Sequence, residues 1–151
     1  MLLSQYGVCM TLEIKRECDG CTECCQGWLF GSAHGKNFWN GRPCHFVGEK
    51  GCTIYKDRPN DPCVTFRCGW LDDTETFPEW LKPSLSKVIA QKLKTKSGIE
   101  FYKIYECGKK IDSTVLNYLV LHALQNSVNM NIQVNGGWSN FGSQAFLNDL
   151  N

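Results

Sequence analysis

The sequence lacks a long apolar run, a strong net charge and a recognisable leader. Lys and Arg number 16 against 15 Asp and Glu, so the formal net charge of +1 indicates no particular partner. A membrane-spanning helix needs about 20 consecutive apolar residues, and no segment approaches that length. The first residues show neither a basic leader nor a continuous apolar stretch, as a secretory signal would. We therefore expect one domain, 1–151, that is cytoplasmic, lies in a reducing compartment and has no membrane partner.

The motifs of the common enzyme classes are also missing from the sequence. It contains no phosphate-binding glycine loop, no nucleotide or methyl-donor fingerprint, no paired carboxylates and no hydrolase triad order. A nucleic-acid partner is not expected either, because the lysine-rich stretch 82–110 has no arginine and no clear interleaving of aromatic residues. The sequence thus predicts no independent catalytic activity, and we assign no catalytic residue.

Cysteine is the residue that the sequence has in excess. Of the 10 cysteines, all but two fall between residues 18 and 68, in a region without apolar periodicity. Their spacing begins with two Cys-x2-Cys steps and an adjacent pair, and the set is Cys18, Cys21, Cys24, Cys25, Cys44, Cys52, Cys63 and Cys68. Thiols stay reduced inside the cell, so a pattern this dense favours a metal site over a disulfide framework, which is the alternative.

The spacing also indicates the kind of metal site. Two residues between cysteines allow a tight turn to aim both sulfur atoms at one ion, as in zinc sites. Three cysteines at this spacing with a distant fourth also match the wrapping around a cubane iron–sulfur cluster. We predict that the eight cysteines are metal ligands, with a 4Fe–4S cluster favoured and Zn²⁺ as the alternative.

The number of metal centres is left open by the sequence. Eight thiolates suffice for two four-ligand centres, or one centre takes four while the rest pack or do redox work. Adjacent side chains point to opposite sides of an extended chain and lie about 100° apart on a helix. Cys24 and Cys25 are therefore not expected to bind the same ion. Either they serve different centres or one is a buried spare. The same geometry argues against His45 as a ligand beside Cys44.

These cysteine motifs resemble a known family. The segments that carry the similarity are CDGCTECC, PCHFVGEKGCTIYKDRPNDPCVTFRCGW and FPEWLKP. They are similar to the cysteine-cluster family called YkgJ-like, described as a zinc- or iron-chelating domain, over residues 17–107. The resemblance implies that the eight cysteines occupy the family's cysteine positions. It also implies a relation to flagellin lysine N-methylases, in which this domain occurs and an iron–sulfur centre is implicated. Asp61 and Pro62 lengthen the family's usual link before Cys63.

The remaining pattern predicts an α+β fold. We expect a loop-rich, metal-organised cysteine region over 17–70, backed by a small antiparallel sheet and one main helix. Alternation of apolar residues predicts a hairpin and two further strands, over 8–14, 86–94, 99–107 and 130–134. The helix is expected from Asp112 or Ser113 to about Ser127, as part of the hairpin–helix–strand segment 71–135. Its predicted buried stripe is Leu116, Leu119, Val120, Ala123 and Leu124.

Residues outside the cysteine cluster have expected roles as well. Cys9 and Cys107 are predicted to be packed thiols rather than ligands. Three tryptophans are expected to shield the metal from water, namely Trp28, Trp70 and Trp80. The tail 136–151 is aromatic with few charges, and Ser143 is expected to cap a helical turn in it. The tail folds back over the hairpin and helix, or it docks on a partner or a second copy through Trp138 and Phe141.

Together these features predict a metal-binding cysteine-cluster protein, iron–sulfur or zinc, that is a non-catalytic structural or accessory component of a larger assembly. The alternative is an iron–sulfur redox or protein-methylation enzyme component. A thiol–disulfide exchanger built on the first cysteine pair is a weaker alternative, because that chemistry rests on one pair and not on eight cysteines.

Overall fold

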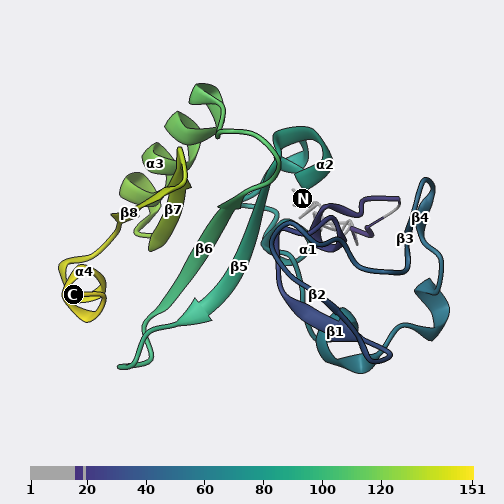
Figure 1. Ribbon diagram of the computed structural model, residues 1–151. Helices are drawn as coiled ribbons and strands as arrows, with labels where there is room; N and C mark the ends of the chain where they lie inside the picture. Colours follow the sequence, from purple (N-terminus) through teal and green to yellow (C-terminus); the bar gives the residue numbers. More distant parts are fainter. Residues whose placement is uncertain (1–15, 19) are drawn as a thin grey trace, which may run out of the picture.

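The computed structural model describes residues 16–18 and 20–151. The strand predicted over 8–14, which includes Cys9, lies outside the described residues. Figure 1 shows two parts, which we call the cysteine half (residues 16–68, loops and short elements) and the sheet half (residues 69–151, long strands and the main helix). Helices and strands occur together, so the predicted α+β class is confirmed. None of the helices in the described part has the length and apolar character that a membrane crossing requires.

The sheet half contains a four-stranded sheet in the order β5-β6-β7-β8. Its strands are β5 Val88–Lys94, β6 Glu100–Glu106, β7 Met130–Val134 and β8 Gly137–Phe141. The predicted hairpin is confirmed as the antiparallel pair β5–β6. The prediction of a small antiparallel sheet was incomplete, because β7 pairs with β6 in parallel and the sheet is mixed. A helix connects β6 to β7, and a crossover of this kind brings two strands into parallel alignment.

The crossover is helix α3, Ser113–Asn126, which begins where the sequence predicts it. Asp112 is the N-cap, and its carboxylate accepts a hydrogen bond from the backbone N–H of Thr114 at 2.8 Å. The buried face of α3 has residues spaced four apart, namely Val115, Leu119 and Ala123. Two further members of the predicted stripe are only partly buried, Leu116 and Val120. The predicted stripe was wrong at Leu124, which is 62% exposed. The buried row of α3 ends with the preceding residue, Ala123, so Leu124 lies outside that row.

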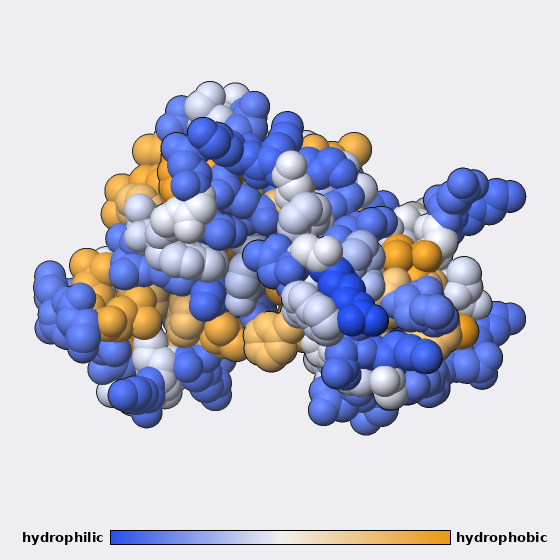
Figure 2. Space-filling view, in the orientation of Figure 1, coloured by the Kyte–Doolittle hydropathy of each residue, from blue (hydrophilic) through white to orange (hydrophobic). Residues whose placement is uncertain are grey.

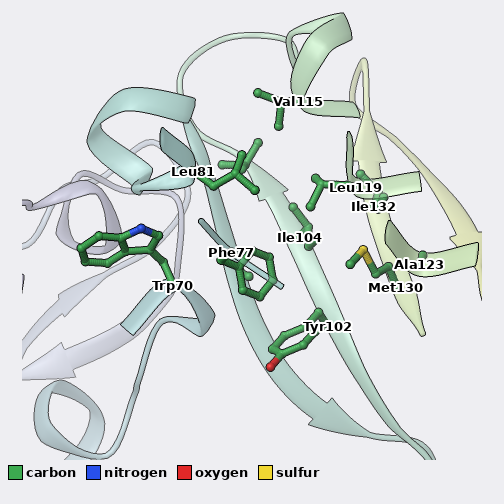
Figure 3. Packing of buried hydrophobic residues seen from close by; sticks show 12 residues of the cluster. Trp70, Phe77, Leu81, Tyr102, Ile104, Val115, Leu119, Ala123, Met130 and Ile132 are labelled. Carbon is green, nitrogen blue, oxygen red and sulfur yellow. The ribbon is translucent and has the colours of Figure 1, made fainter. Parts of the chain in front are cut away.

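The main core lies between the sheet, α3 and the segment that precedes β5. That segment consists of helix α1 (Gly69–Asp72), the turn η4 (Glu79–Leu81) and helix α2 (Pro83–Ser86). It places Trp70, Phe77 and Leu81 against the sheet, as Figure 3 shows. Phe77 meets Tyr102 edge to face, with ring centroids 4.9 Å apart. Each large side chain buried in this way contributes about 1.5–3 kcal/mol to folding.

The segment 136–151, predicted as a docking tail, completes the sheet half. Its strand β8 was not predicted; it pairs with β7 in antiparallel register. Helix α4, Gln144–Asp149, is capped by Ser143, whose hydroxyl oxygen accepts the N–H of Phe146 at 3.2 Å. Phe146 is fully buried, and its ring lies 5.3 Å from that of Phe101 on β6. The tail therefore covers the chain's own sheet.

Regular structure is sparse in the cysteine half. It consists of two short antiparallel hairpins and three turns: β1 Gly31–Ala33 with β2 Lys36–Phe38, β3 Val47–Gly48 with β4 Gly51–Cys52, η1 Glu23–Cys25, η2 Tyr55–Asp57 and η3 Asn60–Val64. Its small core is formed by Ala33, Phe38 and Cys44, with partly buried Cys25, Phe46 and Cys63 around them. Cysteine side chains thus occupy positions that aliphatic residues fill in an ordinary core.

Candidate metal-binding site

Four of the predicted cysteines line one small cavity beside the sheet. Three come from the Cys-x2-Cys-x2-Cys run, whose first turn is closed by the N–H of Cys21 donating to the carbonyl of Cys18 at 2.7 Å. Cys68 reaches the run because its backbone forms an antiparallel bridge to Gln91 of β5. We call these four the sheet-side cysteines: Cys18, Cys21, Cys24 and Cys68. The cavity walls are completed by Trp70, Leu71, Pro83 and Ile89.

The other four predicted cysteines lie among the loops. Cys25, Cys44 and Cys63 pack in the small core of the cysteine half, where the N–H of Cys44 donates to the carbonyl of Cys25 at 2.8 Å. Cys52, on β4, lies beside them. Burial raises the pKa of the Cys44 and Cys63 thiols, and the neighbouring thiols of Cys25 and Cys52 raise it further. We call this set the loop-side cysteines: Cys25, Cys44, Cys52 and Cys63.

The two groups meet at the adjacent pair in η1. The Sγ atoms of Cys24 and Cys25 are 3.8 Å apart. A hydrogen bond from the Cys24 thiol to the Cys25 sulfur raises the pKa of Cys24 and lowers the pKa of Cys25, and burial adds to the rise at Cys24. The next charges that act on Cys24 are those of Cys18 and Cys68, whereas Cys25 lies among the loop-side thiols. Cys24 therefore lines the sheet-side cavity and Cys25 packs in the small core, while the Cys25 thiol also raises the pKa of Cys18 across the boundary.

Burial and crowding raise the pKa of three sheet-side thiols, those of Cys18, Cys24 and Cys68. Burial raises the pKa of Cys68 to about 11, although the backbone N–H groups of Trp70 and Ala90 oppose the shift. Burial followed by the Cys21 thiol raises the pKa of Cys18, with Arg58 opposing it. A thiol binds metal only as the thiolate, so a metal at this place must displace these protons and supply the compensating charge itself.

The donor chemistry of both groups fits a soft metal. The nine cysteines of the described part are free thiols. The walls of the sheet-side cavity include no histidine or carboxylate. At the loop-side group, the rings of His34 and His45 pack edge to face on Phe46 of the small core. Thiolate-only sets select zinc or iron–sulfur clusters over Mg²⁺ or Ca²⁺. Within residues 16–18 and 20–151, no three Cys, His, Asp or Glu side chains are already placed as ligands of one ion. Binding therefore requires the sulfur atoms to move closer together.

Trp70 forms the apolar wall that the sequence predicts beside the cysteines. It is 4% exposed and lines the sheet-side cavity. Its indole Nε1 is buried and has no hydrogen-bond partner among the described residues. The guanidinium of Arg16 stacks 4.5 Å from the Trp70 ring and donates to the carbonyls of Trp70 and Phe77 at 2.6 and 2.5 Å. Sequence reasoning missed Arg16, because a single basic residue before the first cysteine carries no pattern.

The other two tryptophans lie elsewhere. The prediction for Trp80 was wrong, because it is 42% exposed and its ring packs edge to face on Tyr118 of α3. Trp28 lines a second, polar cavity of about 420 Å³ together with Glu23, Lys87, Cys107 and Lys109. Cys107 is 2% exposed, so its prediction as a packed thiol is confirmed, and burial raises its pKa. Two of these lining residues, Lys87 and Glu23, form an ion pair of 2.7 Å between Nζ and Oε1, which joins the two halves.

No family model matches this chain, and neither a curated protein nor a solved structure matches it. The similarity to the cysteine-cluster family therefore depends on the quoted motifs alone.

Proposed function

We propose that this protein is a metal-binding cysteine-cluster protein of the YkgJ-like type, and that it acts as a non-catalytic structural or accessory component of a larger assembly. The observation that carries the proposal is the gathering of all eight predicted cysteines into two adjacent groups of thiols. These thiols come from loops that have little other core. Metal–thiolate bonds would give such loops the stability that burial gives elsewhere.

An iron–sulfur cluster of the 4Fe–4S type is the favoured cofactor, with Zn²⁺ as the alternative. A cubane cluster is wrapped by a short run of cysteines and completed by one from a distant part of the chain. The sheet-side cysteines have this composition, because the run that begins at Cys18 is joined by Cys68, which β5 holds in place. Zinc also needs four thiolates, but it does not require that three of them come from one short run of the chain. The loop-side cysteines therefore suit zinc as well as the sheet-side cysteines do.

A protein partner and a reducing compartment are part of the proposal. The free thiols support a cytoplasmic setting, where disulfides are rare. Figure 2 shows apolar surface, in orange, on both halves of the molecule. In the cysteine half, the exposed aromatic side chains include Phe30 at 85%, Trp39 at 46% and Tyr55 at 50%. Aromatic residues are the usual anchors of protein interfaces, so these side chains support docking on another protein.

An iron–sulfur redox or protein-methylation enzyme component is the second candidate. The polar cavity lined by Trp28 and Cys107 favours it, because this cavity lies close to the sheet-side cysteines and could admit a small substrate. A redox role requires that the bound centre change oxidation state reversibly. The accessory role requires only that the centre be present.

Metal analysis of protein purified without oxygen tests the proposal. We expect stoichiometric iron with acid-labile sulfide and a brown colour, or stoichiometric zinc and no colour. Reversible bleaching by a reductant, without loss of metal, would support the redox candidate. Protein that is folded, reduced and free of both metals would contradict metal binding as its function.

A further inference from the structure

We propose that the eight cysteines form two separate metal centres, one from the sheet-side cysteines and one from the loop-side cysteines. This inference rests on the proposed function, since it divides the same eight ligands. Each centre takes one soft metal unit, a zinc ion or a cubane iron–sulfur cluster, because four thiolates are the complete protein ligand set of either.

The first argument is that the two groups have different walls. The sheet-side cavity is bounded by side chains that also touch the main core or the sheet, including Trp70, Leu71 and Ile89. Three loop-side cysteines, Cys25, Cys44 and Cys63, pack in the small core of the cysteine half, whose other members are Ala33, Phe38 and Phe46. No wall residue is common to these two sets. The sulfur atoms are therefore divided between two environments instead of lining one large cavity.

The second argument is the geometry of the adjacent pair. Cys24 and Cys25 lie in one turn of 3₁₀ helix, and their Sγ atoms are 3.8 Å apart. They have different surroundings, because Cys24 lines the sheet-side cavity whereas Cys25 packs against the small core. With Cys24 assigned to the sheet-side group and Cys25 to the loop-side group, each group has four sulfur atoms and none is left over.

A third observation marks the sheet-side cavity as a ligand site. Trp70 lines the cavity and is 4% exposed, which means that 96% of its surface is buried. Its indole Nε1–H has no acceptor among the described residues. A buried donor without an acceptor is costly. Metal-bound thiolates and cluster sulfides carry the negative charge that such a donor needs, and hydrogen bonds to these sulfur atoms tune a bound centre.

The division is tested by counting metals in the full chain. Reduced protein is loaded with Zn²⁺ as the probe in the presence of a weak competing chelator, and native mass spectrometry gives the number of ions per chain. We expect two ions for the wild type, one for Cys68→Ser, one for Cys63→Ser and two for the matched control Cys107→Ser. The double variants are sharper. Cys24→Ser with Cys68→Ser should still bind one ion, whereas Cys24→Ser with Cys63→Ser should bind none.

A second readout needs no variant. With one equivalent of Zn²⁺ on the wild type, alkylation followed by peptide mass spectrometry should protect the cysteines in sets of four, with Cys24 and Cys25 in different sets. The division is overturned if the wild type binds a single ion, if both double variants behave alike, or if the adjacent pair is protected together in one set. A wild type that binds neither zinc nor iron overturns the proposed function as well, so the two failures are distinguishable.

Discussion

The main core of the sheet half is built from 12 buried side chains, whereas the core of the cysteine half has three, one of which is Cys44. The strands also differ: β5 and β6 have seven residues each, while β3 and β4 have two. Burial of apolar area on this scale explains how the sheet half is held together. The cysteine half has little apolar area to bury, and we propose that metal–thiolate bonds stabilise it instead. The two halves should therefore respond differently to the same perturbations.

The largest expected difference follows removal of the metal. Metal–thiolate bonds of a structural site contribute on the order of 10 kcal/mol, and they exist only in the folded chain. Chelation under reducing conditions should therefore unfold residues 18–68 while the amides of β6 and β7 stay protected. Hydrogen exchange read by mass spectrometry separates the two halves in one experiment. Equal protection of the cysteine half in metal-loaded and demonstrably metal-free protein would refute the contrast between the halves.

The converse perturbation is a cavity in the sheet half. Phe146→Ala should cost about 3–5 kcal/mol of unfolding free energy, because it empties a fully buried site against Phe101. Chemical denaturation measures this loss, and the metal content per folded chain should stay that of the wild type. The matched control is Trp138→Ala, which removes a 42% exposed ring that packs edge to face on Tyr105 and under the Lys103 ammonium, and it should cost about 1 kcal/mol. Similar losses in the two variants would mean that α4 is not part of the core.

A smaller and pH-dependent effect is expected at Asp73, after α1. Burial pushes its pKa up, but hydrogen bonds from Thr76 and from the Tyr102 hydroxyl, the latter 2.8 Å long, leave the pKa below its usual value. A lowered carboxyl pKa stabilises the fold above the unfolded value of about 3.9, and this contribution is lost as the pH falls through the folded pKa. Asp73→Asn should cost about 1 kcal/mol at neutral pH, after allowance for solvent screening.

The measurement for Asp73 is the free energy of unfolding from pH 7 down to pH 2. The difference between wild type and Asp73→Asn should shrink as the solution becomes more acidic. Tyr102→Phe removes one of the donors and should move the acid limb of the wild-type curve toward higher pH. A difference that stays constant over this range would show that the carboxylate charge plays no part.

The smallest expected effect concerns the ion pair between the halves. Glu23→Gln weakens the contact with Lys87, whose side chain is 38% exposed while that of Glu23 is 13% exposed. We expect a loss of up to about 1 kcal/mol, larger at low salt than at high salt. The matched control is Asp72→Asn in the more exposed pair with Arg67, which should be close to neutral. Should both variants prove neutral, the halves are joined by backbone and packing alone.

Much of the sheet half could be predicted from local patterns. The β5–β6 hairpin and β7 follow from alternation, and the two capped helices follow from Asp112 and Ser143, because each signal lies within a few residues of the element it sets. The parallel pairing of β7 with β6 could not be predicted from local patterns, because it depends on how the connecting helix α3 packs on the sheet. Strand β8 was missed because GWSNF has no clear alternation and Gly136-Gly137 looks like an end. Its turn has positive φ at Asn135 and Gly136, which suits a hairpin.

In the cysteine half, less of the structure could be predicted, because its contacts join segments that are distant in the sequence. The spacing of the cysteines identified which residues gather, including Cys68, which is far from the first run in sequence. Spacing alone could not say which distant cysteine joins which group, because that depends on the bridge between Cys68 and Gln91 and on the packing of Cys44 against Cys63. The burial of the Trp70 indole and the stacking of the Arg16 guanidinium on its ring could not be predicted from the sequence either, because both depend on contacts between distant segments.

The bridge between Cys68 and Gln91 has a consequence for solubility. Strand β5 is an edge of the sheet, and an open edge is a template for pairing with other chains. The middle of β5 is covered where Cys68 pairs with it, and the following stretch carries Lys92 and Lys94, whose charges discourage such pairing. The cysteine region therefore covers part of an edge strand that could otherwise pair with other chains. Unfolding of this region would expose that edge, so under the proposed metal-binding function we expect loss of the metal to promote aggregation.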